Sequence, residues 1–354
     1  MKIALGMRLL EGPWGGGMQF GKAFASYFGE RGNQVLFDLR DPEIDIILLT
    51  DPRRSSASAT FSDADIAYYL TNTNPRAIVV QRVNDNSRSR NSNFRSRRLA
   101  LANHCAHRTV FISQWLQDDY ETEGFSLIEP IVIQNGGDRS VFHSIGGRGW
   151  DGHEKLRVVT HHWSTNWKKG FDVYNEIDRL LDQQQYREAF EVTFVGRVPS
   201  TVRFRNTRVV EPLAGTDLAD ELRSHHIYVS ASIGEPAGMH HIEGALCGLP
   251  VLYRQSGALP EYCEKWGWSF TEGNVGLGLL NARERYSEVK PQMADYPYDI
   301  EQCCDSYDRL FRELLANQDE VLGRRKWTHF NGWIFRSCAR VFDLVIYGYD
   351  RLTS

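Results

Sequence analysis

The sequence predicts an α/β protein of two similar domains, each built around a parallel β-sheet with helices on its faces. Its 354 residues exceed what one hydrophobic core usually organises. Short apolar runs alternate with amphipathic stretches in residues 2–137 and again in residues 156–256. This alternation is typical of right-handed βαβ units and a parallel sheet. Residues 143–154 are rich in glycine and lack a hydrophobic period, so we interpret them as a linker.

In the first domain, strands and helices are predicted from apolar runs and from amphipathic stretches. The predicted strands are 2–10, 34–39, 45–50, 77–83, 109–113 and 130–137. The predicted helices are 17–32, 63–72, 94–106 and 114–124. Gly32 ends the first of these helices, as glycine often does.

The second domain repeats the pattern. Its predicted strands are 156–163, 190–196, 207–213, 226–232 and 250–256. Its predicted helices are 171–185, 218–225 and 239–248. Residues 327–349 carry apolar side chains at helical spacing and are expected to pack across a domain surface. The expected division is therefore 1–148, 149–326 and a C-terminal helix in 327–354.

The composition excludes several classes of protein. A net charge of -4 argues against nucleic-acid binding. No apolar stretch approaches the length of a membrane span, and the N-terminus lacks the apolar core of a secretory signal. The six cysteines form no CxxC pair and show no metal-ligand spacing. We therefore expect reduced thiols, a cytoplasmic location and no metal site.

Ligands of open parallel sheets bind beyond the carboxyl ends of the strands, so the loops after the strands are the informative ones. After the first strand, a run of glycines that ends with Gly16 and Gly17 precedes a helix. They allow a backbone to approach a phosphate or sugar, and the helix N-terminus donates N–H groups. The spacing is not GxGxxG, and a plain flexible turn is the alternative.

The loop after 226–232 holds two carboxylates, Glu235 and Glu243, around the start of a helix. The free N–H groups of Gly238, Met239 and His240 can meet a diphosphate. Glu243 can accept hydrogen bonds from a ribose diol, and Glu235 would face what the diphosphate carries. The alternative is that both carboxylates only stabilise the helix end, by ~0.3–1 kcal/mol each.

The loop after 156–163 places Lys168 and Lys169 just before a helix. A lysine there is unfavourable with the helix dipole, so it is expected to meet an anion; a solvated lysine pair is the alternative. His161 and His162 are interpreted as core histidines, because no third metal ligand stands at a matching spacing.

Longer motifs surround these residues. "EPAGMHHIE" carries Glu235 and Glu243 with seven residues between them and continues into "GALCGLPVLYRQSGALPEYC". "IVIQNGGDRSVF", "PWGGG" and "KKG" stand at the matching loops. Together they resemble the retaining glycosyltransferases of family 4. The resemblance covers nearly the whole chain and is most specific in the region from Glu235 to Glu261.

The resemblance implies the GT-B fold: two Rossmann-like domains that face each other across a cleft, with a C-terminal helix that crosses back to the N-domain. It implies sugar transfer from a nucleotide-diphosphate sugar to a glycan or lipid-linked acceptor, with retention and without metal or another cofactor. Polysaccharide or lipopolysaccharide assembly is the expected context. The base, the sugar, the acceptor and the oligomeric state are not determined by the sequence.

The resemblance also assigns roles to residues of this chain. Lys169 is assigned to the diphosphate, and Gly238, Met239 and His240 to phosphate and sugar. Glu243 is assigned to the ribose, Glu235 to the sugar hydroxyls and Leu213 to the base. Gly16 and Gly17 are assigned to the diphosphate or the acceptor.

The sequence departs from the family pattern in three places. Ser164 stands where a phosphate-binding arginine is expected, and Lys168 or Arg197 are candidates to replace that charge. Arg82 follows a middle N-domain strand where a histidine is usual, on the acceptor side. Gly244 replaces an alanine. The alternatives are a nucleotide-sugar epimerase of the same fold and a catalytically silent nucleotide-sugar or glycan-binding protein.

The first domain also has a cluster of arginines. Its members are Arg82, Arg88, Arg90, Arg95, Arg97 and Arg98. They are candidates for contact with an anionic membrane surface at the inner face or with a lipid-linked diphosphate. A solvated loop and helix face is the alternative.

Overall fold

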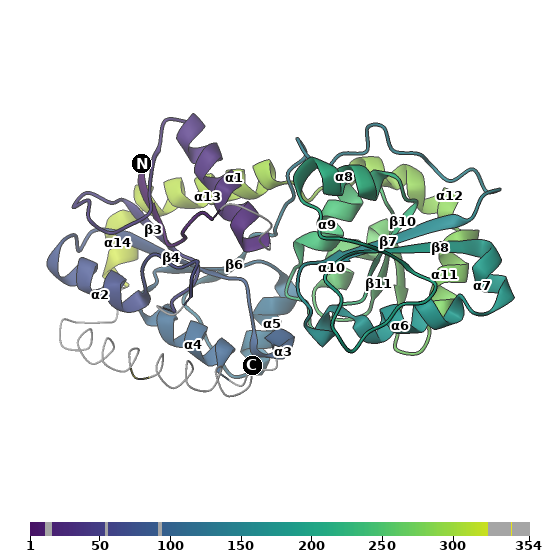
Figure 1. The fold of residues 1–354 in the computed structure, drawn as a ribbon. Helices are drawn as coiled ribbons and strands as arrows, with labels where there is room; N and C mark the ends of the chain where they lie inside the picture. Colours follow the sequence, from purple (N-terminus) through teal and green to yellow (C-terminus); the bar gives the residue numbers. More distant parts are fainter. Residues whose placement is uncertain (11–15, 54–55, 91–93, 325–340, 342–354) are drawn as a thin grey trace. The chain divides into compact units, whose positions relative to one another are not determined.

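The structure is a computed structural model, and it describes residues 1–10, 16–53, 56–90, 94–324 and 341. The chain divides into two compact units (Figure 1). Unit 1 comprises Met1–Glu11, Met18–Gln134 and Cys303–Ser354, and unit 2 comprises Gly12–Gly17 and Asn135–Gln302. Each unit contains a parallel sheet, which confirms the prediction of two Rossmann-like α/β domains.

Unit 1 contains a six-stranded parallel sheet in the order β2-β1-β3-β4-β5-β6. Its strands are β1 (Lys2–Leu5), β2 (Gln34–Leu36), β3 (Ile46–Leu49), β4 (Ile78–Val83), β5 (Arg108–Phe111) and β6 (Pro130–Val132). Its helices are α1 (Gly16–Glu30), α2 (Asp63–Asn72), α3 (Ser87–Arg90), α4 (Arg95–Ala102), α5 (Gln114–Thr122), α13 (Ile300–Ala316) and α14 (Gln318–Gly323). The central strands are fully buried, which explains their uninterrupted apolar runs.

Helices α1 and α13 pack together in unit 1 through aromatic side chains (Figure 1). Phe20, Phe24 and Phe28 recur every fourth residue of α1 and so share one face. Tyr307 and Phe311 of α13 contact this face, with ring centroids 5.6–6.1 Å apart. Helix α13 therefore brings the chain from unit 2 back into unit 1.

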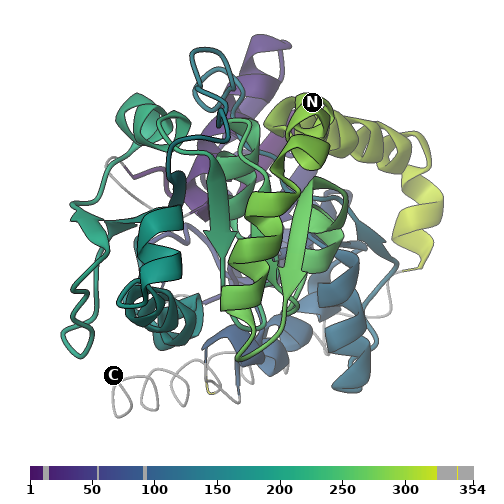
Figure 2. The ribbon, with the colours of Figure 1, turned by 90° about the vertical axis from the view of Figure 1, so that its right-hand side faces the viewer.

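Unit 2 contains a second six-stranded parallel sheet, in the order β12-β11-β10-β7-β8-β9, with helices on both faces (Figure 2). Its strands are β7 (Leu156–His162), β8 (Phe190–Gly196), β9 (Arg208–Val210), β10 (Ile227–Ser230), β11 (Val251–Arg254) and β12 (Gly267–Phe270). Its helices are α6 (Phe171–Leu180), α7 (Gln184–Ala189), α8 (Gly215–Arg223), α9 (Met239–Leu246), α10 (Leu259–Cys263), α11 (Val275–Glu284) and α12 (Tyr286–Val289).

The boundaries between the units differ from the expected ones. Residues 135–148, expected in the first domain, belong to unit 2, and residues 303–324 belong to unit 1. The reason is backbone pairing: Gly137 forms a parallel bridge with Asp299, and Ile300 N donates to Gly137 O at 3.0 Å. A Cβ at Gly136 would lie 1.9 Å from Asp299 O, so only glycine fits this approach. The glycine-rich stretch 143–154 thus lies inside unit 2.

The helix expected in 327–354 lies outside the described residues, except for Val341. Among the helices that the structure does describe, none combines the length and the apolar composition needed to cross a lipid bilayer.

Candidate functional site

The order of the strands in unit 2 reverses direction between β7 and β10. Strand β7 leads outward to β8 and β9 on one side, whereas β10 leads to β11 and β12 on the other. Such a switch point leaves a crevice at the carboxyl ends of the two strands, where open α/β sheets bind ligands. The loops after β7 and β10 contain Lys169 and Glu235, which the sequence analysis singled out.

Lys169 and Glu235 form an ion pair in these loops. Lys169 Nζ lies 2.7 Å from Glu235 Oε2, and Glu235 is 6% exposed. Burial raises the pKa of Glu235, but the charge and the hydrogen bond of Lys169 lower it by more, so its net pKa is below the usual value. Glu235 therefore stays ionised at neutral pH. An ionised carboxylate accepts hydrogen bonds from hydroxyls and cannot donate a proton.

The backbone around Glu235 is fixed by its neighbours. Ala258 N donates to Glu235 O at 2.8 Å, and Ile233 N donates to Lys168 O at 2.8 Å. Gly257 has φ +64°, and a Cβ there would lie 2.4 Å from the backbone of Glu235. Gly257, in the motif downstream of α9, thus packs against the loop that carries Glu235. This close approach gives a physical reason for glycine at this position.

Helix α9 begins beside this ion pair. Gly238 is its N-cap and offers no side-chain hydrogen bond to the first turn. A Cβ at Gly238 would lie 2.5 Å from the His240 ring and 3.0 Å from Glu235 Cδ. The N–H groups of the first turn, at Met239 and His240, therefore begin next to the carboxylate of Glu235. This arrangement suits a ligand with both negative charge and hydroxyl groups.

Glu243 lies deeper, on the buried side of α9. It is 2% exposed, and its Oε2 lies 2.8 Å from Nε2 of His161 at the end of β7. Its Oε1 is buried and accepts no hydrogen bond from any residue in the described part of the chain. The sequence analysis gave Glu243 a role but gave His161 none. The two residues are 82 positions apart, and no local pattern links them.

The other histidines of the site are buried and neutral. His162 Nε2 lies 2.7 Å from Tyr174 OH, and Ser230 Oγ lies 2.8 Å from His240 Nε2. Burial is the main cause that lowers the pKa of His162 and of His240 well below the usual value, and it lowers that of His241 to about 4. Both ring nitrogens of His241 are buried without a partner among the described residues. The interpretation of His161 and His162 as core histidines agrees with their burial.

Three further sequence candidates follow β7, β8 and β9. Ser164 is half-buried after β7 and its Oγ accepts from Asn166 N at 3.2 Å. Arg197 is exposed directly after β8, and its N donates to His162 O at 3.2 Å. Leu213 is half-buried between β9 and α8. The backbone of Arg197 is therefore tied to the end of β7, where the loop that carries Lys169 begins.

The remaining candidates are two glycines and an arginine. Gly16 and Gly17 are the first residues of α1, and a Cβ at Gly16 would lie 2.0 Å from Cγ of Met239 at the start of α9. Arg82, on β4 of unit 1, is 2% exposed, and its guanidinium lies 4.0 Å from the Phe20 ring centroid. Arg82 also contacts Tyr307 of α13 through a hydrogen bond and its charge. It thus lies in the packing between α1 and α13, which argues against contact with an acceptor.

Asn135 was singled out by its motif but given no role. Its Nδ2 donates to Ala237 O at 3.0 Å, and its backbone N donates to Tyr262 OH at 2.9 Å. Asn135 therefore holds the segment between Glu235 and α9 from the side.

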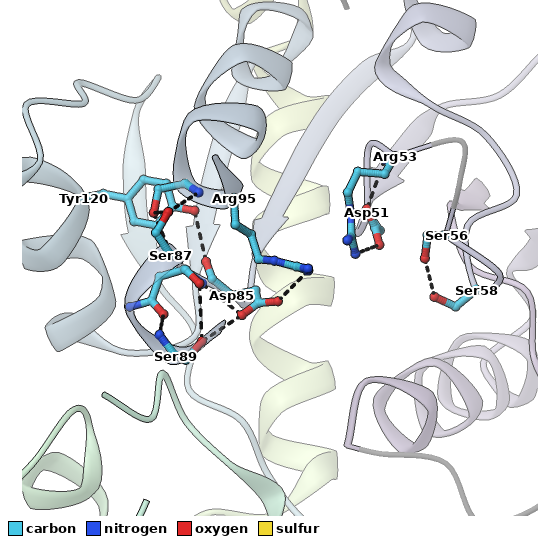
Figure 3. A network of polar contacts seen from close by, with 11 residues as sticks. Asp51, Arg53, Ser56, Ser58, Asp85, Ser87, Ser89, Arg95 and Tyr120 are labelled. Carbon is cyan, nitrogen blue, oxygen red and sulfur yellow. Dashed lines mark hydrogen bonds and ion pairs between the residues drawn. The ribbon is translucent and has the colours of Figure 1, made fainter. Parts of the chain in front are cut away.

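The arginines of unit 1 are largely paired with aspartates. Figure 3 shows Arg53 with Asp51 and Arg95 with Asp85, at 2.6 Å and 3.0 Å, after β3 and β4. Arg98 is 1% exposed and makes two hydrogen bonds to Asp63.

Two other members of the arginine cluster are exposed. Arg88 pairs with Asp119, and Arg97 is exposed. The side chain of Arg90 lies outside the described part. Aspartates therefore pair with three of the six arginines of the cluster: Arg88, Arg95 and Arg98.

No group of three or more histidine, cysteine, aspartate or glutamate side chains in the described part of unit 1 or unit 2 is placed to hold a metal ion.

The sequence matches no family model and no curated protein. Its structure is similar to that of HepE from Anabaena in complex with UDP and glucose, at 15% identity and a TM-score of 0.63, over 89% of this chain and 100% of that chain. It is also similar to AviGT4, a glycosyltransferase involved in avilamycin A biosynthesis, at 14% identity and a TM-score of 0.61, over 89% and 98%.

A third similar structure is that of TarM, at 14% identity and a TM-score of 0.56, over 75% of this chain. The chain spans 54% of the length of TarM. With the two parallel sheets described above, these similarities show that the chain has the GT-B fold.

Proposed function

We propose that the chain is a retaining glycosyltransferase that moves a sugar from a nucleotide-diphosphate sugar to an acceptor hydroxyl in glycan assembly. The observation that carries the proposal is the half-buried Lys169–Glu235 ion pair at the N-terminus of α9, with Glu243 on that helix. A cation beside a helix N-terminus suits a diphosphate, and two carboxylates suit the hydroxyls on its two sides.

In the proposed reaction, the bond between the sugar C1 and the diphosphate oxygen breaks. Negative charge develops on the departing oxygen, and Lys169 and the first N–H groups of α9 stabilise it. Such preorganised electrostatic stabilisation is commonly the largest catalytic contribution. Since these groups supply the positive charge, the proposal includes no metal ion and no other cofactor.

The acceptor hydroxyl forms the new bond to C1, and its proton passes to the departing phosphate oxygen. Attack and departure on the same face retain the anomeric configuration. Glu235 is ionised and paired with Lys169, which fits a residue that orients the sugar hydroxyls rather than a proton donor. Double displacement would instead need a carboxylate placed to attack C1.

The remaining donor contacts are assigned by position. Gly238, Met239 and His240 hold phosphate and sugar, and Gly16 and Gly17 line the diphosphate or acceptor. Ser164 leaves the phosphate without its usual arginine, and Arg197 is the proposed replacement. Arg197 is exposed and has no ion-pair partner in the described part of the chain. Leu213 is assigned to the base.

The partners are a nucleotide-sugar donor and a glycan or lipid-linked acceptor. The similarity in fold to a chain in complex with UDP and glucose makes uridine-diphosphate sugars the first donors to test. The proposal includes a cytoplasmic location, with which the buried thiols of Cys247 and Cys263 agree. A peripheral contact with a membrane is also proposed, although aspartates pair with three of the six arginines that suggested it, Arg88, Arg95 and Arg98.

The test begins with thermal shifts for UDP, GDP, ADP, dTDP and CMP, with and without divalent metal, on the wild type and on Glu243→Ala. One diphosphate should stabilise the wild type alone, without metal. Donor turnover is then measured with the matching sugars. Turnover by the wild type that Glu235→Ala abolishes would exclude the silent binding protein. Nucleotide binding without turnover of any donor would favour it.

A further inference from the structure

The carboxylate of Glu243 is held from one side only. Its Oε2 lies 2.8 Å from His161 Nε2, and the two side chains are 3% and 4% exposed. Its Oε1 is buried as well and has no hydrogen-bond partner in the described part of the chain. A buried carboxylate oxygen without a partner is costly, so its presence points to a ligand that supplies the missing donor.

His161 is itself held from its other side by Tyr228. The hydroxyl of Tyr228 lies 3.2 Å from His161 Nδ1 and accepts a hydrogen bond from the His161 backbone N at 3.1 Å. One assignment of protons satisfies all three contacts. The His161 backbone N donates to Tyr228 OH, Tyr228 OH donates to Nδ1, and Nε2–H donates to Glu243. Tyr228 is fully buried in β10, so it cannot follow a movement of His161.

Helix α9 makes room for this arrangement. A Cβ at Gly244, the residue after Glu243, would lie 2.4 Å from Cδ2 of Tyr228. The absence of a side chain at Gly244 thus lets the Tyr228 ring lie against α9, where its hydroxyl reaches His161. This contact gives a structural reason for glycine in place of alanine at this position.

We propose that His161, fixed by Tyr228, is a positioning residue that sets the orientation of Glu243 so that Oε1 accepts a hydrogen bond from a ribose hydroxyl of a nucleoside diphosphate. This inference rests on the proposed function. Because Oε1 has no other partner among the described residues, a ligand without the hydroxyl leaves a buried acceptor unpaired. Sites of this kind reject such analogues strongly. The arrangement therefore makes His161 a determinant of the preference for ribose over deoxyribose.

The test compares dissociation constants of UDP, GDP and ADP with those of their 2′-deoxy forms by calorimetry. The wild type should prefer the ribose form by about tenfold or more, as expected for a hydrogen bond to a charged acceptor. Glu243→Ala and His161→Phe should bring the ratio close to one. His161→Gln, whose amide nitrogen can stand near the position of Nε2, should keep most of the preference.

A matched control separates positioning from packing. His225 is also buried in unit 2 and bonds to Glu221 O and Ser224 Oγ of α8 and its C-cap. His225→Phe should lower thermal stability but leave the ribose preference unchanged. If His161→Phe does not fold, Tyr228→Phe retains the ring and removes the hydroxyl, and it should lower the preference to an intermediate value.

Two results would overturn the inference in different ways. If Glu243→Ala loses the preference while a folded His161→Phe keeps the wild-type ratio, the positioning role is wrong and the proposed function stands. If the wild type binds none of the diphosphates, the proposed function fails and the inference fails with it.

Discussion

Charged side chains lie at the carboxyl ends of strands in both units, but the two units differ in whether the polar atoms of these regions have partners. In unit 1, Asp51 pairs with Arg53 after β3, and Asp85 pairs with Arg95 after β4 (Figure 3). In unit 2, the Lys169–Glu235 pair lies at the start of α9, and Glu243 of that helix has an oxygen without a partner among the described residues. The ring of His241, two positions before Glu243, also has no partner in the described part.

The difference indicates where a charged ligand belongs. An ion pair whose two charges satisfy each other stabilises the fold of a loop. Its interaction is lost if a ligand separates the two side chains. A buried acceptor without a partner gains an interaction when a ligand supplies a donor. We therefore propose that the nucleotide binds in unit 2, where the Glu243 oxygen has no partner among the described residues, and regard the arginine–aspartate pairs of unit 1 as structural.

The largest expected effect is a loss of stability of unit 2 in acid. Burial lowers the pKa of His225, His226 and His241 to about 4, whereas the unfolded chain binds these protons near pH 6.5. Acidification from pH 6.5 to 4 therefore favours unfolding, by up to about 1.4 kcal/mol per pH unit for each histidine. Hydrogen exchange at pH 7 and 5 should show unit 2 opening before unit 1.

The control for the acid effect is His225→Gln, which should reduce the pH dependence of the free energy of unfolding by about one proton. Equal opening of both units at pH 5 would contradict the predicted difference between them.

The second effect concerns the closed pairs of unit 1. Arg98→Ala leaves the buried carboxylate of Asp63 without its main partner and should lower the free energy of unfolding by about 3–5 kcal/mol. Urea unfolding measures this loss. The neighbouring Arg97 is exposed, so Arg97→Ala should change stability by less than about 0.5 kcal/mol. Similar values for the two variants would refute the structural role of the pair.

The third effect concerns catalysis in unit 2. Lys169→Ala removes the cation proposed to stabilise the departing diphosphate and should lower kcat by about 100- to 1,000-fold. Its measurement is donor turnover at saturating substrate. Lys155 is exposed in the same unit, and Lys155→Ala should retain wild-type turnover. A Lys169→Ala enzyme with unchanged kcat would remove Lys169 from the mechanism.

The smallest effect concerns Arg197. Its side chain is exposed, so its charge is partly screened and Arg197→Ala should weaken diphosphate binding by only about three- to tenfold. Binding of the uncharged nucleoside should not change. Calorimetry with UDP and uridine, repeated at high salt, distinguishes a contact with phosphate from one with the base.

Much of the fold followed from local features of the sequence. The alternation of apolar runs and amphipathic stretches predicted both parallel sheets, because buried parallel strands need uninterrupted apolar residues. The predicted strand 2–10 was longer than β1, and the predicted helix 171–185 is divided into α6 and part of α7. The elements after residue 256 in unit 2 were not predicted individually.

The loop residues of the site were also readable, because glycines and charged residues directly after a strand are local signals. Glu235, Lys169 and Gly238 were singled out in this way, and the structure brings them together. Their chemical roles stay proposals, because the similar structures establish the fold alone.

What the sequence by itself determined is therefore the set of strands and helices and the loops that carry charge, because periodicity and glycine act over a few residues. The tertiary structure alone decided the partner of Glu243, the burial of Arg82 and the assignment of α13 to unit 1. Each depends on side chains from segments far apart in the chain. Packing and the pairing of buried polar groups select such contacts, and no local pattern records them.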